Sequence, residues 1–97
     1  MRLRWTKLAE GDLEVIADYI GQDSPAAAAR VVLELLDQAE NVLSPNPAIG
    51  RPGRVLGTRE FVIAGLPYII AYRVRGKDLE VLRVLHTSRR WPDDIQG

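Results

Sequence analysis

The spacing of apolar residues changes once along this chain, from helical in the first half to strand-like in the second. Apolar residues recur every three or four positions over residues 7–20 and again over residues 26–43, the spacing that gives a helix one apolar face. Residues 1–6 alternate polar with apolar side chains and predict a short strand. The first half is therefore expected to form a strand followed by two helices.

Residues with strong capping preferences mark the ends of the two predicted helices. Thr6 stands at the N-cap position of the first helix, and Gly21 follows its last apolar position. Ser24 and Pro25 supply the second start signal, a capping hydroxyl followed by a proline at the first helical position. The second helix should end before Pro45, because proline cannot continue a helix.

Valine, isoleucine, tyrosine and phenylalanine dominate three segments of the second half, at residues 59–64, 68–75 and 79–86. Turn residues separate them at 65–67 and 76–78, a pattern typical of an antiparallel three-stranded meander. The predicted fold is α+β with the order β-α-α-β-β-β: two N-terminal helices packed on one face of a small, mainly antiparallel sheet. The whole chain of 97 residues is expected to be one domain.

A proline- and glycine-rich segment, residues 44–58, joins the helices to the meander. It contains three prolines and three glycines and predicts a loop that is irregular throughout. At about 15 residues it is long for a compact domain, and loops of that length are often functional.

A three-residue hairpin loop at 76–78 would decide which side chains of the last two strands share a face. The register would pair Arg75 with Leu79, Tyr72 with Leu82, Ile70 with Val84 and Tyr68 with His86. The apolar face should receive the helices, and the other face should gather Arg73, Arg75 and Arg83 among apolar residues. We expect that second face to stay uncovered by the chain's own helices, which would make it a docking face for another polypeptide.

The amino-acid composition is typical of a folded domain that does not lie in a membrane. The chain is 46% hydrophobic and 27% charged, enough to bury a core and keep a polar surface. It has no apolar run of about 20 residues and no signal-like N-terminus, so the cytoplasm is the expected location. Without cysteine and with a single histidine, it is expected to hold no metal and no cofactor.

The net charge of zero conceals an uneven distribution of charge. Residues 1–50 carry eight acidic and four basic side chains, and residues 51–97 carry nine basic and five acidic ones; eight of those nine are arginines. Arginine suits carboxylates and phosphates, so the second half is expected to face an anion or a partner. The alternative is a solvated face balanced by the acidic helices. Overall neutrality argues against unaided nucleic-acid binding.

Two segments near the C-terminus carry candidate chemistry. Histidine exchanges protons near neutral pH, so His86 is a candidate acid or base, although the end of an apolar strand equally suits a structural role. Arg89, Arg90 and Trp91 combine two guanidinium groups with an indole, which could clamp a phosphate or stack on a base. Trp91 could instead anchor the tail on the sheet.

Together these segments have a familiar order. A strand and two helices are followed by Ile49–Arg54, Gly57–Ile63, Tyr68–Val74, Val81–His86 and Arg89–Pro92. Over essentially the whole chain, this order and spacing resemble the RelE/ParE superfamily of toxins. The resemblance implies the toxin half of a type II toxin–antitoxin operon, held inactive in a hetero-oligomer with a cognate antitoxin.

The superfamily has two activities: RelE-like members cleave mRNA on the ribosome, and ParE-like members poison DNA gyrase. RelE-like members carry basic residues along the second and third strands and a tyrosine near the C-terminus. Here Glu60, Val62 and Ile69 stand at those strand positions, and no tyrosine follows Arg90. The resemblance therefore favours ParE-like inhibition of gyrase without catalysis. Cleavage of mRNA on the ribosome, with Arg90 and His86 as catalytic residues, is the alternative.

The residues expected to engage the target or the antitoxin lie on the arginine-bearing sheet face and in the C-terminal segment. Arg59 is expected to order the loop that precedes it. A third possibility is an interaction module without toxicity. The candidate binding residues are Arg59, Arg73, Arg83, Arg89, Arg90 and Trp91.

Overall fold

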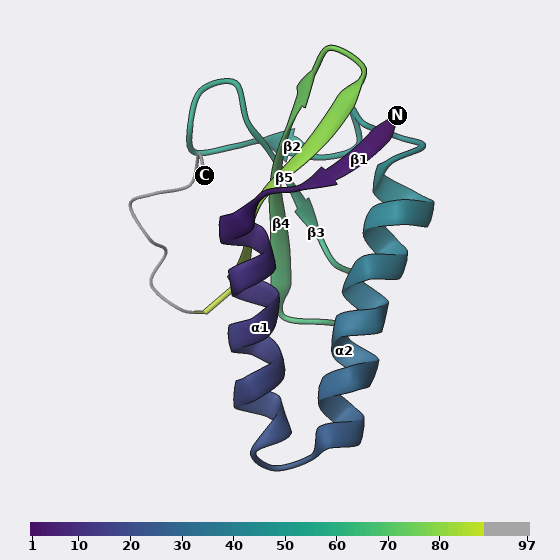
Figure 1. Ribbon diagram of the computed structural model, residues 1–97. Helices are drawn as coiled ribbons and strands as arrows, with labels where there is room; N and C mark the ends of the chain where they lie inside the picture. Colours follow the sequence, from purple (N-terminus) through teal and green to yellow (C-terminus); the bar gives the residue numbers. More distant parts are fainter. Residues whose placement is uncertain (89–97) are drawn as a thin grey trace.

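A five-stranded sheet carries two helices on one of its faces (Figure 1). The computed structural model describes residues 1–88. The strand order is β1-β5-β4-β3-β2, with β1 parallel to β5 and every other pair antiparallel, so the predicted fold class is confirmed. The elements are β1 (Arg2–Trp5), α1 (Lys7–Gly21), α2 (Pro25–Gln38), a π-helical turn η1 (Ala39–Leu43), β2 (Arg51–Pro52), β3 (Arg59–Val62), β4 (Tyr68–Arg75) and β5 (Asp78–His86).

Both predicted helix starts are confirmed. The Thr6 hydroxyl accepts a hydrogen bond from the Ala9 N–H at 3.2 Å, and the Ser24 hydroxyl accepts one from the Ala27 N–H at 3.1 Å. Each bond satisfies an amide that the first helical turn leaves without a partner. Neither helix of the described residues combines the length and the apolarity needed to cross a bilayer.

The second helix does not stay α-helical to residue 43 as predicted. Its α-helical part ends at Gln38, and the chain continues through η1, where the Ser44 N–H bonds to the Ala39 carbonyl at 2.9 Å. The Ser44 hydroxyl then donates to the Met1 carbonyl at 2.8 Å. This wider last turn therefore ties the end of the helical segment to the start of β1.

The predicted loop contains the short strand β2, which the sequence analysis missed. Arg51 and Pro52 pair with Glu60 and Arg59 on the edge of the sheet. Two residues are too few to show an alternating pattern, and proline is usually depleted in strands. The expectation of a segment irregular throughout was therefore wrong.

The tip of the β4–β5 hairpin is tighter than predicted. Gly76 has a φ of 61°, which glycine adopts without strain and which fits the first position of a two-residue hairpin turn. Arg75 consequently lies opposite Asp78 rather than Leu79. The turn has two residues, and the expected three-residue loop was wrong.

A bulge at Leu82 restores the expected register in the rest of the hairpin. Tyr72 lies opposite Val81, not Leu82 as predicted, and the next pair joins Ala71 to Arg83. The bulge leaves Leu82 without an opposite residue. The backbone N–H of Thr6 bonds to the Val81 carbonyl at 3.1 Å, and its hydroxyl lies 3.0 and 3.1 Å from the carbonyls of Val81 and Leu82. The expected pairs Ile70–Val84 and Tyr68–His86 are confirmed.

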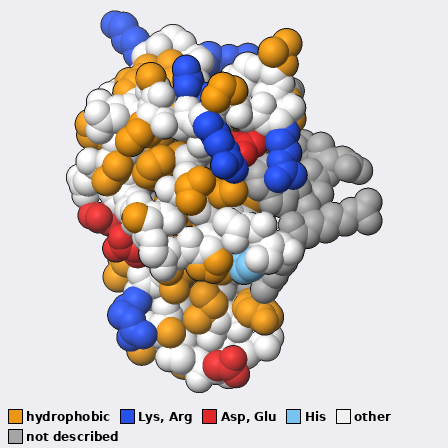
Figure 2. All heavy atoms as spheres, turned by 180° about the vertical axis from the view of Figure 1, so that it is seen from behind, with side chains coloured by type: hydrophobic (Ala, Val, Ile, Leu, Met, Phe, Trp, Pro, Cys, Tyr) orange, Lys and Arg blue, Asp and Glu red, His pale blue; other side chains and the backbone are white. Residues whose placement is uncertain are grey.

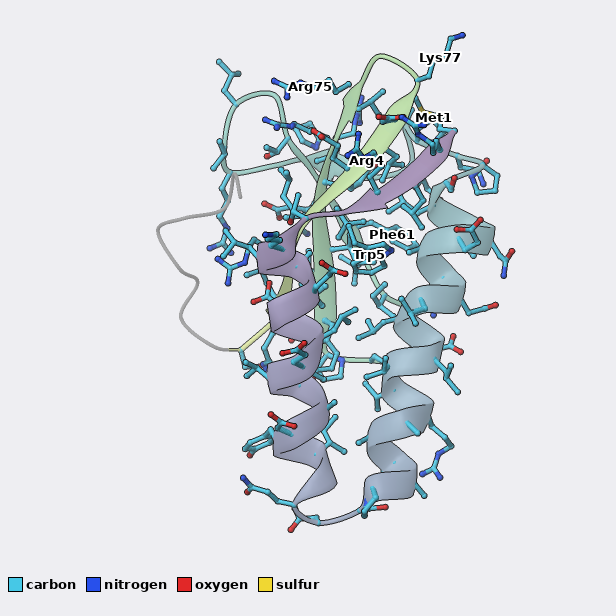
Figure 3. The ribbon with its side chains drawn as sticks, viewed as in Figure 1. Met1, Arg4, Trp5, Phe61, Arg75 and Lys77 are labelled. Atoms are coloured by element: carbon cyan, nitrogen blue, oxygen red, sulfur yellow. The ribbon has the colours of Figure 1, made fainter. Side chains whose placement is uncertain are left out.

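The hydrophobic core lies between the helices and the sheet. Trp5 and Phe61 project into this space from two different strands (Figure 3), and among residues 1–88 Tyr72 is the largest side chain that is fully buried. This main core therefore occupies the helix-covered face. The buried members are Ala9, Ile16, Leu35, Ala39, Leu43, Phe61, Ile63, Tyr68, Ile70, Tyr72, Leu79, Val81 and Val84.

Candidate partner-binding surface

On the sheet face away from the helices, arginines flank two carboxylates. Neighbours in a row across a sheet project to the same face, and two such rows cross β4, β5 and β1. The rows are Arg75–Asp78–Arg2 and Arg73–Glu80–Arg4. We call these six residues the arginine ladder: two columns of arginines, on β4 and β1, stand on either side of two acids on β5.

The two acids of the ladder are recessed beneath the arginines. Arg2 donates to Asp78 from Nε at 2.9 Å and from Nη2 at 3.2 Å, Arg4 Nη1 donates to the same carboxylate at 3.4 Å, and Arg73 Nε donates to Glu80 at 2.7 Å. The acids are 17% and 18% exposed, whereas Arg2 and Arg4 are 72% and 59% exposed. Hydrogen bonds from Arg2 and Arg4 lower the pKa of Asp78, and the bond to Asp78 raises the pKa of Arg2.

At the tip of the ladder, its member Arg75 and the neighbouring Lys77 have side chains with no counter-ion in the described part of the chain. The side chains of Arg75 and Lys77 are exposed, and Figure 3 shows both at the end of the hairpin farthest from the turn that joins the helices. Residues 1–88 provide neither side chain with a hydrogen bond or an ion pair. The ladder therefore has more positive than negative charge, and the excess is at the surface.

The apolar part of this face is not bare, contrary to expectation. Ile69, Ala71 and Leu85 are all buried, and Val55 from the loop packs against Ala71 and Leu85. The loop before β3 thus covers part of the face that the helices leave open. The predicted bare, half-apolar platform was wrong for its apolar half.

Arg83 is bound to a helix rather than displayed on the sheet. Its Nε and Nη2 each donate to the Asp12 carboxylate of α1 at 2.7 Å, and the Val84 N–H donates to the same carboxylate at 2.9 Å. The Arg83 side chain is 13% exposed. The expectation that it projects from an uncovered face was therefore wrong, and the residue joins α1 to β5.

Arg59 orders the preceding loop, as predicted. Its Nη1 donates to the Gly50 carbonyl at 2.7 Å and to the Ala48 carbonyl at 3.4 Å. Tyr72, beside it on β4, donates to the Pro47 carbonyl at 2.7 Å and accepts from the Gly50 N–H at 2.9 Å. Burial raises the pKa of the Tyr72 phenol. Both side chains act on the loop from the helix-covered side of the sheet.

On the open face of β3, Glu60 binds the loop and offers no basic group. Its buried carboxylate accepts from Arg51 Nη2 at 3.3 Å and from the Arg54 backbone N–H at 2.9 Å. Val62, two residues on, is half-exposed and apolar. The acid therefore fastens the loop to β3.

His86 closes β5 in a packed environment. Its ring meets Tyr68 edge-on with the centroids 5.4 Å apart, and its Nδ1 accepts from the Ser88 N–H at 3.0 Å. Arg89, Arg90 and Trp91 lie outside the described residues. Within residues 1–88, no group of three or more potential ligands could hold a metal ion.

Charge is divided between the two layers of the molecule. The helical segment, residues 7–40, carries eight acidic and two basic side chains, a net charge of −6; the remaining described residues carry nine basic and three acidic ones, a net charge of +6. In Figure 2 most of the Lys and Arg side chains in view lie in the upper half of the molecule. The sequence analysis placed the arginines in the second half of the chain and so missed Arg2 and Arg4, although the alternation Arg-Leu-Arg-Trp put them on one side of a strand.

Residues 3–91 match the family described as the ParE toxin of the type II toxin–antitoxin system, parDE. The chain belongs to this ParE family. It is thus the toxin component of a type II toxin–antitoxin system, and that membership implies an antitoxin partner.

Three relatives agree with this assignment over nearly the whole chain. A toxin-named protein of Sinorhizobium fredii, Y4kP, is 48% identical over 94% of this chain and 93% of its own length. Toxin RelE2 of Caulobacter vibrioides is 40% identical over 88% of this chain and 93% of its own. A solved structure described as the chromosomal ParDE TA system from P. aeruginosa superposes with a TM-score of 0.80 at 32% identity, covering 91% of this chain and 97% of the other.

Proposed function

We propose that this ParE-family chain inhibits DNA gyrase by binding to it in the cytoplasm, without catalysis. We further propose that a cognate antitoxin neutralises it by forming a hetero-oligomer over an overlapping surface. Family membership supports a toxin of this class, and the composition of the sheet supports binding rather than RNA cleavage.

The observation that carries the proposal is the lack of cations at three positions on the open sheet face. Cleavage of RNA needs a base for the 2′-hydroxyl and cations for the charge that develops on phosphate. On β3 and β4, the three positions hold the buried acid Glu60, the apolar Val62 and the buried Ile69. None of the three can stabilise a negative charge, which favours a binding mechanism.

The proposed contacts with gyrase are Arg73, Arg89, Arg90 and Trp91. Arg73 is 26% exposed and pairs with Glu80 in the ladder, so part of its side chain is accessible to a partner. We assign Arg59 and Arg83 an indirect part: Arg59 holds the loop at Gly50, and Arg83 holds β5 against α1 shortly before the C-terminal segment.

Paired assays with the purified chain test the proposal: supercoiling by gyrase, and cleavage of mRNA on translating ribosomes. The proposal expects loss of supercoiling and intact mRNA. The double variant Arg89→Gln/Arg90→Gln should need about tenfold more protein for the same inhibition. The matched control Lys7→Gln/Arg30→Gln removes two exposed charges from the helices and should inhibit like the wild type.

Two outcomes would overturn the proposal. The first is normal supercoiling at all toxin concentrations. The second is mRNA that is cut by the wild type and left intact by a His86→Ala/Arg90→Ala variant, which would establish the ribosome and mRNA as the target.

A further inference from the structure

We propose that the arginine ladder binds an extended acidic segment of the antitoxin, with carboxylates at alternate positions. The choice of the antitoxin as the source rests on the proposed function. The site itself rests on the geometry and charge of β1, β4 and β5, and it includes two residues of the N-terminal strand, Arg2 and Arg4.

The spacing of the ladder matches that of an extended polypeptide. Arg73 and Arg75 are two positions apart on β4, as are Arg2 and Arg4 on β1, so the guanidinium groups of each column start about 6.8 Å apart along the strand. In an extended segment, side chains at alternate positions project to one side with the same spacing. Glutamates or aspartates at alternate positions would thus meet successive rows.

The width of the ladder leaves a track between its columns. The columns on β4 and β1 are separated by β5, which places their backbones about 10 Å apart. Asp78 and Glu80 occupy the floor of this track and are less exposed than the arginines beside them. A carboxylate above the floor would have an arginine on each side, a geometry suited to charge-assisted hydrogen bonds.

The charge of the ladder favours an anionic partner. Its four arginines outnumber its two acids, and Lys77 adds a further cation at the tip. The side chain of Arg75 has no ion pair within the described residues, so an incoming carboxylate need not break one to bind it. Complementary charge of this kind raises the association rate and the specificity of binding.

A nucleic acid fits the same surface less well. Base recognition on a flat sheet uses exposed aromatic rings, and the ladder has none, because Trp5 and Tyr72 project to the helix-covered face. The helical layer carries a net charge of −6, which would oppose a long polyanion. A short acidic peptide needs only the ladder.

Fluorescence anisotropy with defined peptides tests the proposal on the full chain. The probe is a fluorescein-labelled peptide of alternating glutamate and threonine, and a second peptide has the same composition with its glutamates in one block. The wild type should bind the alternating peptide more tightly, and Arg2→Gln/Arg75→Gln should weaken binding about tenfold or more. The control Lys7→Gln/Arg30→Gln removes the same charge from the helices and should change the affinity less than about twofold.

Three results would overturn the proposal: equal binding of both peptides, equal weakening by the ladder and control variants, or tighter binding of a short duplex DNA than of the alternating peptide. Should the double variant fail to fold by circular dichroism, Arg75→Gln alone replaces it, since that side chain has no described contact to lose. If the chain binds the peptide but does not inhibit gyrase, the gyrase target is rejected and the ladder proposal stands. If the chain inhibits gyrase but does not bind the peptide, the ladder proposal is rejected and the gyrase target stands.

Discussion

Asp12 of α1 binds Arg83 of β5 through two hydrogen bonds of 2.7 Å, and the same carboxylate accepts the Val84 N–H at 2.9 Å. Seventy-one positions separate the two charged residues in the chain. Their side chains are 15% and 13% exposed, so water competes little for these bonds. This pair fixes the position of α1 relative to β5 at a point where β1 no longer pairs with that strand.

Replacing Asp12 should therefore destabilise the whole domain. Asp12→Asn removes the charge and one acceptor oxygen, leaving a largely buried guanidinium without its counter-ion, and should lower the free energy of unfolding by about 2 kcal/mol. Urea denaturation followed by circular dichroism measures the change. Glu14→Gln makes the same chemical change at an exposed position of α1 and should stay within about 0.5 kcal/mol of the wild type. Equal effects of the two variants would show that Asp12 has no special role.

Two glycine substitutions should have opposite effects. A Cβ on Gly50 would lie 2.6 Å from the Tyr72 hydroxyl and 3.0 Å from the Glu60 carbonyl, so Gly50→Ala should displace the loop and cost about 1–3 kcal/mol. Gly11 lies inside α1 with no atom within 4 Å of its added Cβ, and Gly11→Ala should stabilise by about 0.5–1 kcal/mol. Thermal melting of both variants measures these effects. A Gly50→Ala variant as stable as the wild type would show that the close approach of Gly50 to Tyr72 does not fix the loop.

The side-chain amide of Gln38 hydrogen-bonds to the backbone of the turn between β3 and β4, as the backbone of a neighbouring strand would. Its amide accepts from the Ala64 N–H at 3.3 Å and donates to the Ala64 carbonyl at 3.2 Å. Gln38→Leu should leave both backbone groups without these bonds and cost about 1–2 kcal/mol. Amide hydrogen exchange at Ala64 should accelerate by about tenfold. Gln22→Leu, at the exposed end of α1, is the matched control, and similar losses in both variants would contradict the role of Gln38.

The features that the sequence predicted correctly are local ones. The starts of both helices follow from Thr6 and Ser24, whose hydroxyls bond to amides three residues later. The strand at 68–75 follows from its composition and its bounding turns. Each depends on neighbours within a few positions, which a periodic pattern records.

The features that the sequence did not predict depend on distant pairing or on a single extra residue. The bulge at Leu82 places Val81 on the core side of the sheet, so the residues of β5 before the bulge project to the opposite faces from those expected. The ladder exists because β1 runs parallel beside β5, which brings Arg2 within 2.9 Å of Asp78 across 76 positions. Arg83 was assigned to an open face because nothing local links it to Asp12.

The contribution of Asp78 to stability should depend on pH in a defined direction. Arg2 and Arg4 lower the pKa of Asp78 below its ordinary value of 3.8, so the folded state favours the charged form. The stabilisation is then complete above that ordinary value and is lost as the pH falls through the lowered folded-state pKa. The difference in melting temperature between the wild type and Asp78→Asn should accordingly be constant near neutral pH and shrink in acid.

The same two arginines provide the control for this pH dependence. In an Arg2→Gln/Arg4→Gln background the cause of the shift is gone, so the pKa of Asp78 followed by carboxyl NMR should move up toward 3.8. The difference in melting temperature caused by Asp78→Asn should then be smaller at neutral pH and should change less as the pH falls. Added salt should also reduce the difference in melting temperature between the wild type and Asp78→Asn, because the side chains of Arg2, Arg4 and Asp78 are close to solvent. A carboxyl pKa that stays unchanged when both arginines are replaced would disprove the ion pairing on which the ladder depends.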